Sequence, residues 1–276
     1  MSIFDEPKID CHVHVLDPWR FPYRADTHYR PAGQETGTYE QLDALFAAYG
    51  TRHAVIVGPN SGYGLDNTCL LAALARAAGR HRGIAVVRND VTRDELLALK
   101  AQGVVGVAWN VTFYGIPYYD DAAPLLAHLR DLGMCVSVQV EHDQMVAMRP
   151  LLEDSGVTVL VDHCGRPTAD AGLDQGGFRA VLALAGTGHA YVKLSGVAKI
   201  TPEAFPYAPA TPYFEALLAA YTPARCLWAS DWPYLRATSR MDYGVLLKHI
   251  ERMLPDPAVR RQVLWETPRA LFGFAA

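Results

Sequence analysis

The sequence has 276 residues, half of them hydrophobic and a fifth charged, with a formal net charge of −4. This balance is typical of a globular protein with a large buried core and excludes an intrinsically disordered chain. We expect neither nucleic acid nor an anionic membrane as a partner, because both bind basic surfaces. The acidic first residues do not resemble a signal peptide, and no run reaches about 18 apolar residues, so we expect a cytoplasmic protein.

Eight short apolar runs alternate along the chain with helical patterns, and we interpret them as strands. They cover 8–14, 53–59, 82–87, 104–110, 135–141, 157–163, 190–196 and 226–231. Helical patterns over 38–50, 66–79, 92–103 and 120–133 each end at a glycine, and Thr92 and Glu95 form a capping box.

This alternation predicts a parallel sheet in a single domain over residues 1–276. Eight units of this kind predict a (β/α)8 TIM barrel, which typically needs about 250 residues. An open doubly wound sheet is the alternative, but it would require a glycine-rich turn after the first strand, where the chain reads HVHVLDPW. The five cysteines are scattered and odd in number, which predicts reduced thiols.

Polar side chains recur where the predicted strands end, and in a TIM barrel these ends meet at one mouth. His12 and His14 are two residues apart on a strand, so their side chains point to the same side. Three imidazoles and a carboxylate converge there from three strands. The group comprises His12, His14, Asn110, Gln139, Glu141, His163, Lys193, Ser195 and Asp231.

Several motifs together resemble the lactonase branch of the amidohydrolase superfamily, which includes pyrone-dicarboxylate and muconolactone hydrolases. They are DCHVHVLDPWRFPY (10–23), VIVGPNSGYGLDN (55–67), GIAVVRNDVT (83–92), VLVDHCGRP (159–167) and LWASDWP (227–233). The resemblance implies a catalytic site of His12, His14, His163 and Asp231, with Asp231 as the general base toward water.

The resemblance leaves two metal states open, because the branch contains zinc-dependent and metal-free members. His12, His14 and Asp231 could hold one Zn²⁺, with His163 either a fourth ligand or a free hydrogen-bonding group. The chain lacks the lysine or glutamate of the fourth strand and the histidine of the fifth that hold a second metal in many relatives, so a binuclear centre is not expected.

The substrate pocket differs from that of the dicarboxylate-hydrolysing members, which carry arginines after the fourth strand. Here that stretch is VAWNVTFYGIPYY (107–119), which predicts an aromatic pocket and argues against 2-pyrone-4,6-dicarboxylate as the substrate. The candidate substrate-binding residues are Ser61, Asn67, Trp109, Asn110, Tyr114, Gln139, Arg166 and Lys199. Two of them have structural alternatives, since Asn67 could cap a helix and Arg166 could hold the loop in which it lies.

Hydrolysis of a small-molecule lactone is the function that these residues favour. Asp231 would activate water, and the histidines or one zinc ion would polarise the carbonyl. The alternatives are a lactone isomerase or a zinc-dependent decarboxylase on the same barrel, and a barrel that binds a ligand without turnover. The long connections 15–38 and 197–212 are candidate lids or substrate-binding elements. A homodimer is the base-rate expectation.

Overall fold

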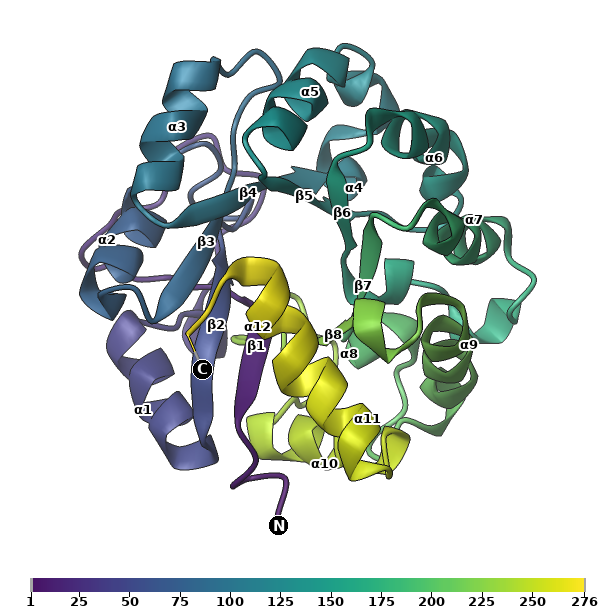
Figure 1. Cartoon of the computed structure of the whole chain (residues 1–276). Helices are drawn as coiled ribbons and strands as arrows, with labels where there is room; N and C mark the ends of the chain where they lie inside the picture. The colour runs from purple at the N-terminus through teal and green to yellow at the C-terminus, as the bar shows by residue number, and fades with distance from the viewer. Residues whose placement is uncertain (1, 276) are drawn as a thin grey trace.

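The computed structural model describes residues 2–275, and its centre is a sheet of eight parallel strands in sequence order. The strands are β1 (Lys8–Val13), β2 (Thr51–Val57), β3 (His81–Ala85), β4 (Val104–Asn110), β5 (Cys135–Gln139), β6 (Thr158–Val161), β7 (Ala190–Leu194) and β8 (Cys226–Trp228). The sheet curls into a barrel surrounded by helices (Figure 1). The predicted TIM barrel is therefore confirmed.

Helices follow the strands and cover the outside of the barrel. The main ones are α1 (Tyr39–Tyr49), α2 (Thr68–Ala77), α3 (Arg93–Ala101), α5 (Ala123–Asp131), α6 (Gln144–Ser155), α7 (Gly176–Leu184), α9 (Thr211–Tyr221) and α10 (Tyr243–Met253). Short helices are α4 (Val111–Tyr114), α8 (Val197–Ile200), α11 (Pro257–Arg261) and α12 (Thr267–Phe272). The capping box predicted at α3 is confirmed, since the Thr92 hydroxyl accepts from the Glu95 N–H at 3.3 Å.

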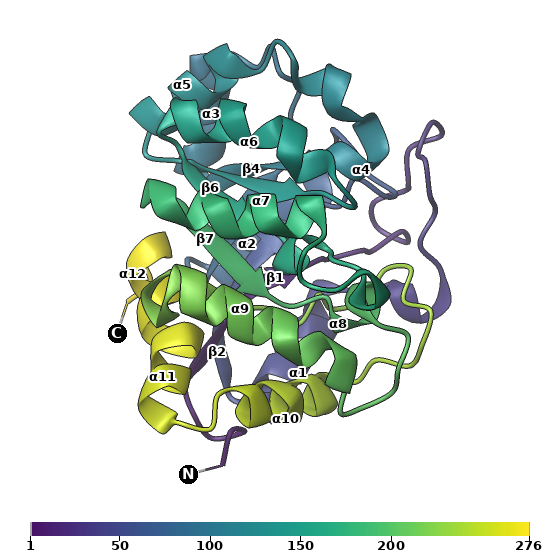
Figure 2. The same ribbon diagram turned by 90° about the vertical axis from the view of Figure 1, so that its right-hand side faces the viewer.

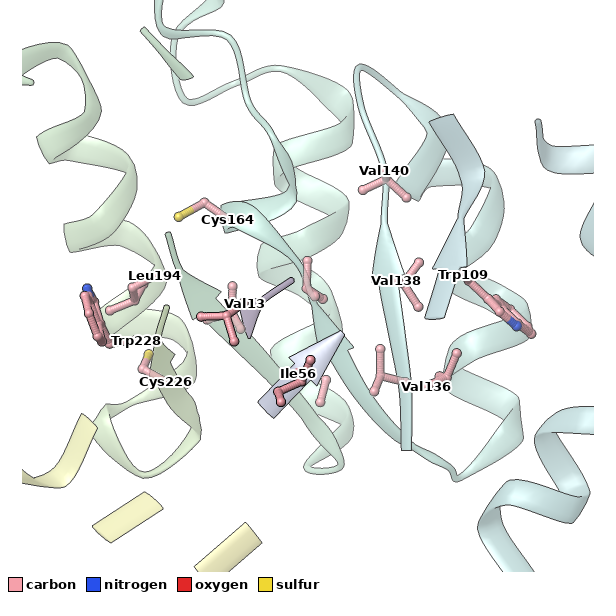
Figure 3. Close-up of a cluster of buried hydrophobic side chains, with 14 of the residues drawn as sticks. Val13, Ile56, Trp109, Val136, Val138, Val140, Cys164, Leu194, Cys226 and Trp228 are labelled. Carbon is pink, nitrogen blue, oxygen red and sulfur yellow. The ribbon is translucent and has the colours of Figure 1, made fainter. Parts of the chain in front are cut away.

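The strands alternate between an outer and an inner core, as their period of two requires. Val136 and Val138 of β5 belong to the outer cluster between strands and helices, part of which Figure 3 shows. Cys135 of β5 faces the inner cluster, together with Leu160 and Leu227 from β6 and β8. The sequence of each strand thus separates the residues that hold the helices from those that fill the barrel.

The two ends of the barrel differ. Trp265, Phe272 and Phe274 pack with Ile9 of β1 in the inner cluster and plug the end where the strands begin. Figure 2 shows α12 at this end, whereas α4 and α8, which follow β4 and β7, lie toward the other. The end where the strands finish carries the cavity that His12, His163 and Asp231 line.

Asp10 helps to close the barrel between its first and last strands. Its Oδ1 accepts from the N–H of Ser230 at 3.0 Å and from the N–H of His12 at 3.3 Å. Nearby, the N–H of Asp231 donates to the carbonyl of His12 at 3.0 Å, and the N–H of His14 donates to the carbonyl of Trp232 at 2.8 Å. These bonds fix the position of Asp231 relative to His12.

All five cysteines are free and buried, as the sequence predicts. Among residues 2–275, no helix is both long and apolar enough to cross a membrane.

Candidate active site

His12 and His14 reach the mouth of the barrel through an irregularity in β1. The pairing of β1 with β2 shifts register between Asp10 and Val13. Cys11 belongs to the inner core and His12, the next residue, lines the cavity, so the normal alternation is broken at this point. Bulges of this kind re-aim side chains beside active sites.

His163 and Asp231 follow β6 and β8 on sharply turned backbone. Their φ angles are +51° for His163 and +64° for Asp231, in the left-handed region that ordinary residues seldom occupy. Such conformations cost on the order of 1–3 kcal/mol each and are concentrated at functional sites. In both cases the turn leaves the side chain lining the cavity.

Three imidazoles surround one carboxylate oxygen. The Nε2 atoms of His163, His14 and His12 lie 3.6, 3.8 and 3.9 Å from Oδ1 of Asp231. The rings of His12 and His163 are 4.6 Å apart between centroids. The structure therefore brings together the four residues proposed as catalytic from the sequence.

Burial keeps two of these imidazoles neutral and makes the carboxylate more basic. It lowers the pKa of His14 to about 3 and the pKa of His163 well below its usual range. Burial also raises the pKa of Asp231 above the usual range of an aspartic acid. A carboxylate with a raised pKa is a stronger base toward water.

The Nδ1 atoms of the histidines are held by different partners. Nδ1 of His14 lies 2.8 Å from the carbonyl oxygen of Val57, and since a carbonyl only accepts, that nitrogen carries the proton of the neutral ring. Nδ1 of His163 lies 3.0 Å from Oγ of Ser195. Each ring is thus fixed in orientation from behind.

A buried polar network lies behind His12, and it includes Lys193, which the sequence placed at the mouth but which does not line the cavity. Lys193 of β7 lies 2.7 Å from Oδ1 of Asp162, and Ser137 of β5 donates to the same oxygen at 2.7 Å. Although burial alone would raise the pKa of Asp162, the ammonium of Lys193 holds it well below the usual range. The alternation of β7 does carry a signal, because Lys193 stands between the outward-facing Val192 and Leu194.

The cavity at the mouth has a volume of about 520 Å³. It contains most of the residues predicted to bind substrate, which are Ser61, Trp109, Asn110, Gln139, Arg166 and Lys199. The amide of Gln139 points toward Oδ1 of Asn110 at 3.5 Å, and the same oxygen caps α4 by accepting from the N–H of Phe113 at 3.1 Å. Amide groups therefore form one polar wall opposite the imidazoles.

The structure places two predicted contact residues outside the cavity and a third largely beneath its wall. Asn67 lies outside the cavity and its side chain does not cap α2, because its amide donates to the carbonyl of Val86 at 2.8 Å and accepts from the Val86 N–H at 3.0 Å. Tyr114 also lies outside the cavity, stacked on Tyr118 at 4.7 Å. Trp109 borders the cavity, but its ring is 2 % exposed and packs in the outer core (Figure 3).

Three cations also line the cavity. The guanidinium of Arg166 lies 3.3 Å from the carboxylate of Glu141. Nζ of Lys199 donates to the carbonyl of Leu235 at 2.8 Å, which connects the loop after β7 with the loop after β8. Arg236 completes the set, with its guanidinium 5.7 Å above the ring of Tyr29.

The two long connections differ in their relation to this cavity. Ala198 and Lys199, in the connection 197–212, belong to its lining. Among residues 2–275, none of the connection 15–38 does, and His28 instead packs against the rings of Phe113 and Tyr114 at 5.8 and 5.9 Å. The first connection therefore buttresses the wall formed after β4.

Two overlapping sets of side chains lie close enough to hold one metal ion. His12, His163 and Asp231 present ligand atoms within 4.8 Å of one another. His14 of the expected set is equally near, since its Nε2 lies 3.3 Å from Nε2 of His12 and 3.8 Å from Oδ1 of Asp231. Tetrahedral zinc with bonds of about 2.0–2.1 Å needs ligand atoms roughly 3.4 Å apart. The Nε2 to Oδ1 separations of 3.6 and 3.9 Å approach this spacing.

Known proteins resemble this chain over nearly its whole length. The family model described as Amidohydrolase matches residues 9–274. The 4-sulfomuconolactone hydrolase of Rhizobium radiobacter is 32 % identical over 272 residues, covering 96 % of this chain and 89 % of the relative. The D-galactarolactone isomerase of Agrobacterium fabrum is 27 % identical over 274 residues, covering 98 % and 92 %.

A solved structure gives the same result. The crystal structure of a probable 2-pyrone-4,6-dicarboxylic acid hydrolase from Acinetobacter baumannii, with citric acid bound, superposes with a TM-score of 0.88. It is 26 % identical, and the match covers 97 % of this chain and 99 % of that one. With the family model and a relative above 30 % identity both spanning the barrel, the chain belongs to the amidohydrolase family.

Proposed function

We propose that this protein hydrolyses a lactone, a cyclic ester, to the open hydroxy acid. The observation that carries the proposal is the arrangement of three Nε2 atoms within 3.9 Å of Oδ1 of Asp231, at the floor of an open cavity. The names of the sulfomuconolactone and pyrone-dicarboxylic acid hydrolases support it, because both describe ring-opening hydrolysis.

Asp231 is the general base in this proposal. Its carboxylate takes a proton from a water molecule as that water attacks the lactone carbonyl carbon. The low-dielectric surroundings that raise the pKa of Asp231 make this transfer easier. The imidazole edges of His12 and His163 face the same point and orient the carbonyl oxygen, on which negative charge develops, whereas His14 presents an unprotonated Nε2 there.

Collapse of the tetrahedral intermediate breaks the bond between the carbonyl carbon and the ring oxygen. The protonated Asp231 then returns its proton to the departing alkoxide, which gives a hydroxyl group and restores the carboxylate. One carboxyl group thus serves both half-reactions, and the product is a carboxylic acid and an alcohol within one molecule, the acid then losing its proton to solvent at neutral pH.

A metal ion fits this scheme as an additional Lewis acid. His12, His163 and Asp231 are the residues that would hold it, and Zn²⁺ is the ion that nitrogen and oxygen ligands at this spacing suggest. When bound it would polarise the carbonyl and lower the pKa of water. The alternative is catalysis by the imidazoles and the carboxylate alone.

The substrate in this proposal is a small lactone carrying one anionic group. Lys199, Arg236 and Arg166 line the cavity, and Arg166 already faces Glu141, so two cations remain to hold a carboxylate or sulfonate. Asn110 and Gln139 would donate to or accept from ring substituents, and Ser61 would do so from the other side.

The test is turnover of a panel of lactones, assayed before and after chelation and paired with elemental analysis of the purified protein. The panel contains a muconolactone, a sulfonated muconolactone, an aldarolactone and 2-pyrone-4,6-dicarboxylate. We expect hydrolysis of at least one mono-anionic member and weak turnover of the pyrone dicarboxylate. Stoichiometric zinc with chelator-sensitive activity would assign the metal-assisted route, and chelator-resistant activity the metal-free one. Failure to open any member would refute the proposal.

Lactone isomerisation is a second candidate, favoured by the 27 % identical galactarolactone isomerase. An isomerase moves the ester to another hydroxyl and takes up no net water. Turnover in ¹⁸O-labelled water separates the two reactions, because hydrolysis places one labelled oxygen in the product carboxylate. Decarboxylation has weaker support, because two solved dihydroxybenzoate decarboxylases that resemble this chain share only 12–13 % identity with it and so support the fold alone.

Cellular location and assembly remain predictions. Five free, buried thiols accord with a reducing compartment, and we propose the cytoplasm. A homodimer is proposed on the general frequency of such assemblies, and size-exclusion chromatography with light scattering would test it.

A further inference from the structure

Lys193 is a fully buried lysine directly behind His12. It is the penultimate residue of β7 and has no exposed surface, and its side chain points into the barrel. Its Nζ lies 2.7 Å from Oδ1 of Asp162, 2.9 Å from Oγ of Ser137 and 3.1 Å from Nδ1 of His12. The proposed chemistry does not use it, although it touches one of the four residues at the centre of the site.

The three contacts of Lys193 match the three protons of its ammonium group. An ammonium has three donors and no acceptor, so each of its partners must offer a lone pair. The Asp162 carboxylate and the Ser137 hydroxyl both do, and the hydroxyl in turn donates its own proton to Oδ1 of Asp162. The third partner, Nδ1 of His12, must then be unprotonated, which places the proton of the neutral ring on Nε2.

The opposite tautomer is poorly accommodated. A proton on Nδ1 of His12 could reach only Oδ1 of Asp162, at 3.5 Å, where two shorter bonds already end. It would also point at the ammonium of Lys193 and leave one ammonium proton without an acceptor. A buried donor without a partner costs about 1–3 kcal/mol, and more when it is charged.

The contacts of the other ring nitrogen of His12, Nε2, support the same tautomer. Its Nε2 lies 3.3 Å from Nε2 of His14, so one of these two nitrogens must donate and the other accept. His14 carries its proton on Nδ1, bonded to the Val57 carbonyl, and so presents a lone pair at Nε2. Hydrogen bonds therefore run in one direction, from Lys193 through His12 and His14 to the backbone of β2.

We propose that Lys193 is a positioning residue that holds the proton of His12 on Nε2 and thereby opposes metal binding at that nitrogen. A metal ion needs the lone pair of that nitrogen, so binding would force the proton onto Nδ1, against the ammonium. The catalytic consequence rests on the proposed lactone hydrolysis, since a donor at Nε2 polarises a carbonyl without a metal. The effect on metal affinity does not depend on it.

The first test reads the tautomers in the metal-free wild-type protein. Long-range ¹H–¹⁵N spectra of histidine-labelled protein distinguish a protonated from an unprotonated ring nitrogen, and His12→Gln and His14→Gln variants assign the signals. We expect the proton of His12 on Nε2 and that of His14 on Nδ1, so the two rings are internal controls for each other. A proton on Nδ1 of His12 would overturn the proposal.

The second test measures zinc affinity by competition with a chromophoric chelator. Lys193→Met keeps the length of the side chain and frees Nδ1 of His12 to donate to Asp162, the arrangement that supports metal-bound histidines. We expect zinc to bind roughly 10–100-fold more tightly, the range by which such partners change metal affinity. Lys199→Met is the matched control, because it removes a cavity cation that does not touch His12.

The outcomes separate the proposed roles. A gain in Lys193→Met that far exceeds the gain in Lys199→Met supports control of the tautomer. Equal gains would mean that charge alone matters, and no gain would mean that Lys193 does not restrain the metal, so either result overturns the proposal. If Lys193→Met does not fold, the wild-type spectra still decide. Neither readout uses lactone turnover, so failure here is distinct from failure of the proposed function.

Discussion

Replacing Asp231 by asparagine removes the proposed general base while preserving the size and shape of the side chain. Asparagine tolerates the left-handed backbone that this position requires, at φ +64°. The three imidazole nitrogens near Oδ1 lie at 3.6–3.9 Å, longer than ordinary hydrogen bonds, so the substitution breaks few bonds in the resting enzyme. We therefore expect the variant to fold and to retain substrate binding.

The expected loss is in kcat. A positioned general base contributes about 10²–10⁴-fold to the rate, equivalent to about 3–5 kcal/mol of activation free energy. Asp231 serves both the attack of water and the protonation of the leaving alkoxide, so the upper part of that range applies. KM should change little, because the carboxylate acts on water rather than on the substrate.

The stability of the Asp231→Asn variant should not fall, although its kcat does. Burial raises the pKa of Asp231 in the folded state, so at neutral pH the carboxylate ionises more readily once the chain unfolds. This group therefore favours folding only at acidic pH and opposes it once the pH exceeds the unfolded pKa of about 4. Asp231→Asn should melt at a temperature equal to or higher than that of the wild type at pH 7.

The assay is initial-rate hydrolysis of the best lactone of the panel, with thermal melts of the same preparations. Glu141→Gln is the matched control, because it neutralises another carboxylate of the cavity, one that faces Arg166 rather than the imidazoles. It should change KM more than kcat. A folded Asp231→Asn protein with kcat within about tenfold of the wild type would refute the general-base role.

Three further substitutions test the frame of the site. Asp162→Asn leaves Lys193 without its carboxylate and should lower the free energy of unfolding by about 3–5 kcal/mol in urea titrations. In the wild type this contribution should fade below about pH 4, since the pKa of Asp162 is lowered by folding. Asn110→Ala removes the α4 cap and should cost about 1 kcal/mol in the same titrations while raising KM. Gly177→Ala places a Cβ 1.8 Å from a backbone carbonyl and should cost at least about 1–3 kcal/mol, whereas Gly186→Ala, with open space around it, should not.

The barrel was predictable from the sequence because its signals are local. Apolar runs such as 135–141 have a period of two, and the glycine or capping residues beside them mark where each helix begins and ends. The end of the last strand was the least accurate strand end, because β8 ends at Trp228 and the backbone then turns to place Asp231. Hydrophobicity does not report such a turn, so the predicted strand extended three residues too far.

The residues at the centre of the site were predictable from their positions at strand ends, whereas the contacts of the loop residues around the cavity were not. Residues at strand ends must meet in a barrel, which brings His12, His163 and Asp231 together whatever the loops do. The direction of a loop side chain follows instead from hydrogen bonds formed after folding. Asn67 turns to bridge the backbone of Val86, so its place in a motif did not reveal its contact.

For Lys193, the sequence predicts the direction of the side chain, and only the folded structure shows its partners. Its inward direction follows from its outward neighbours on β7, so the sequence alone places an ammonium inside the barrel. Its partners Asp162, Ser137 and His12 lie 31, 56 and 181 residues from it along the chain, and only the stagger of the strands brings them to one nitrogen. The position of a single proton on His12 follows from that stagger. Two chains with the same histidines and aspartate could therefore differ in their demand for a metal, depending on what stands behind the first imidazole.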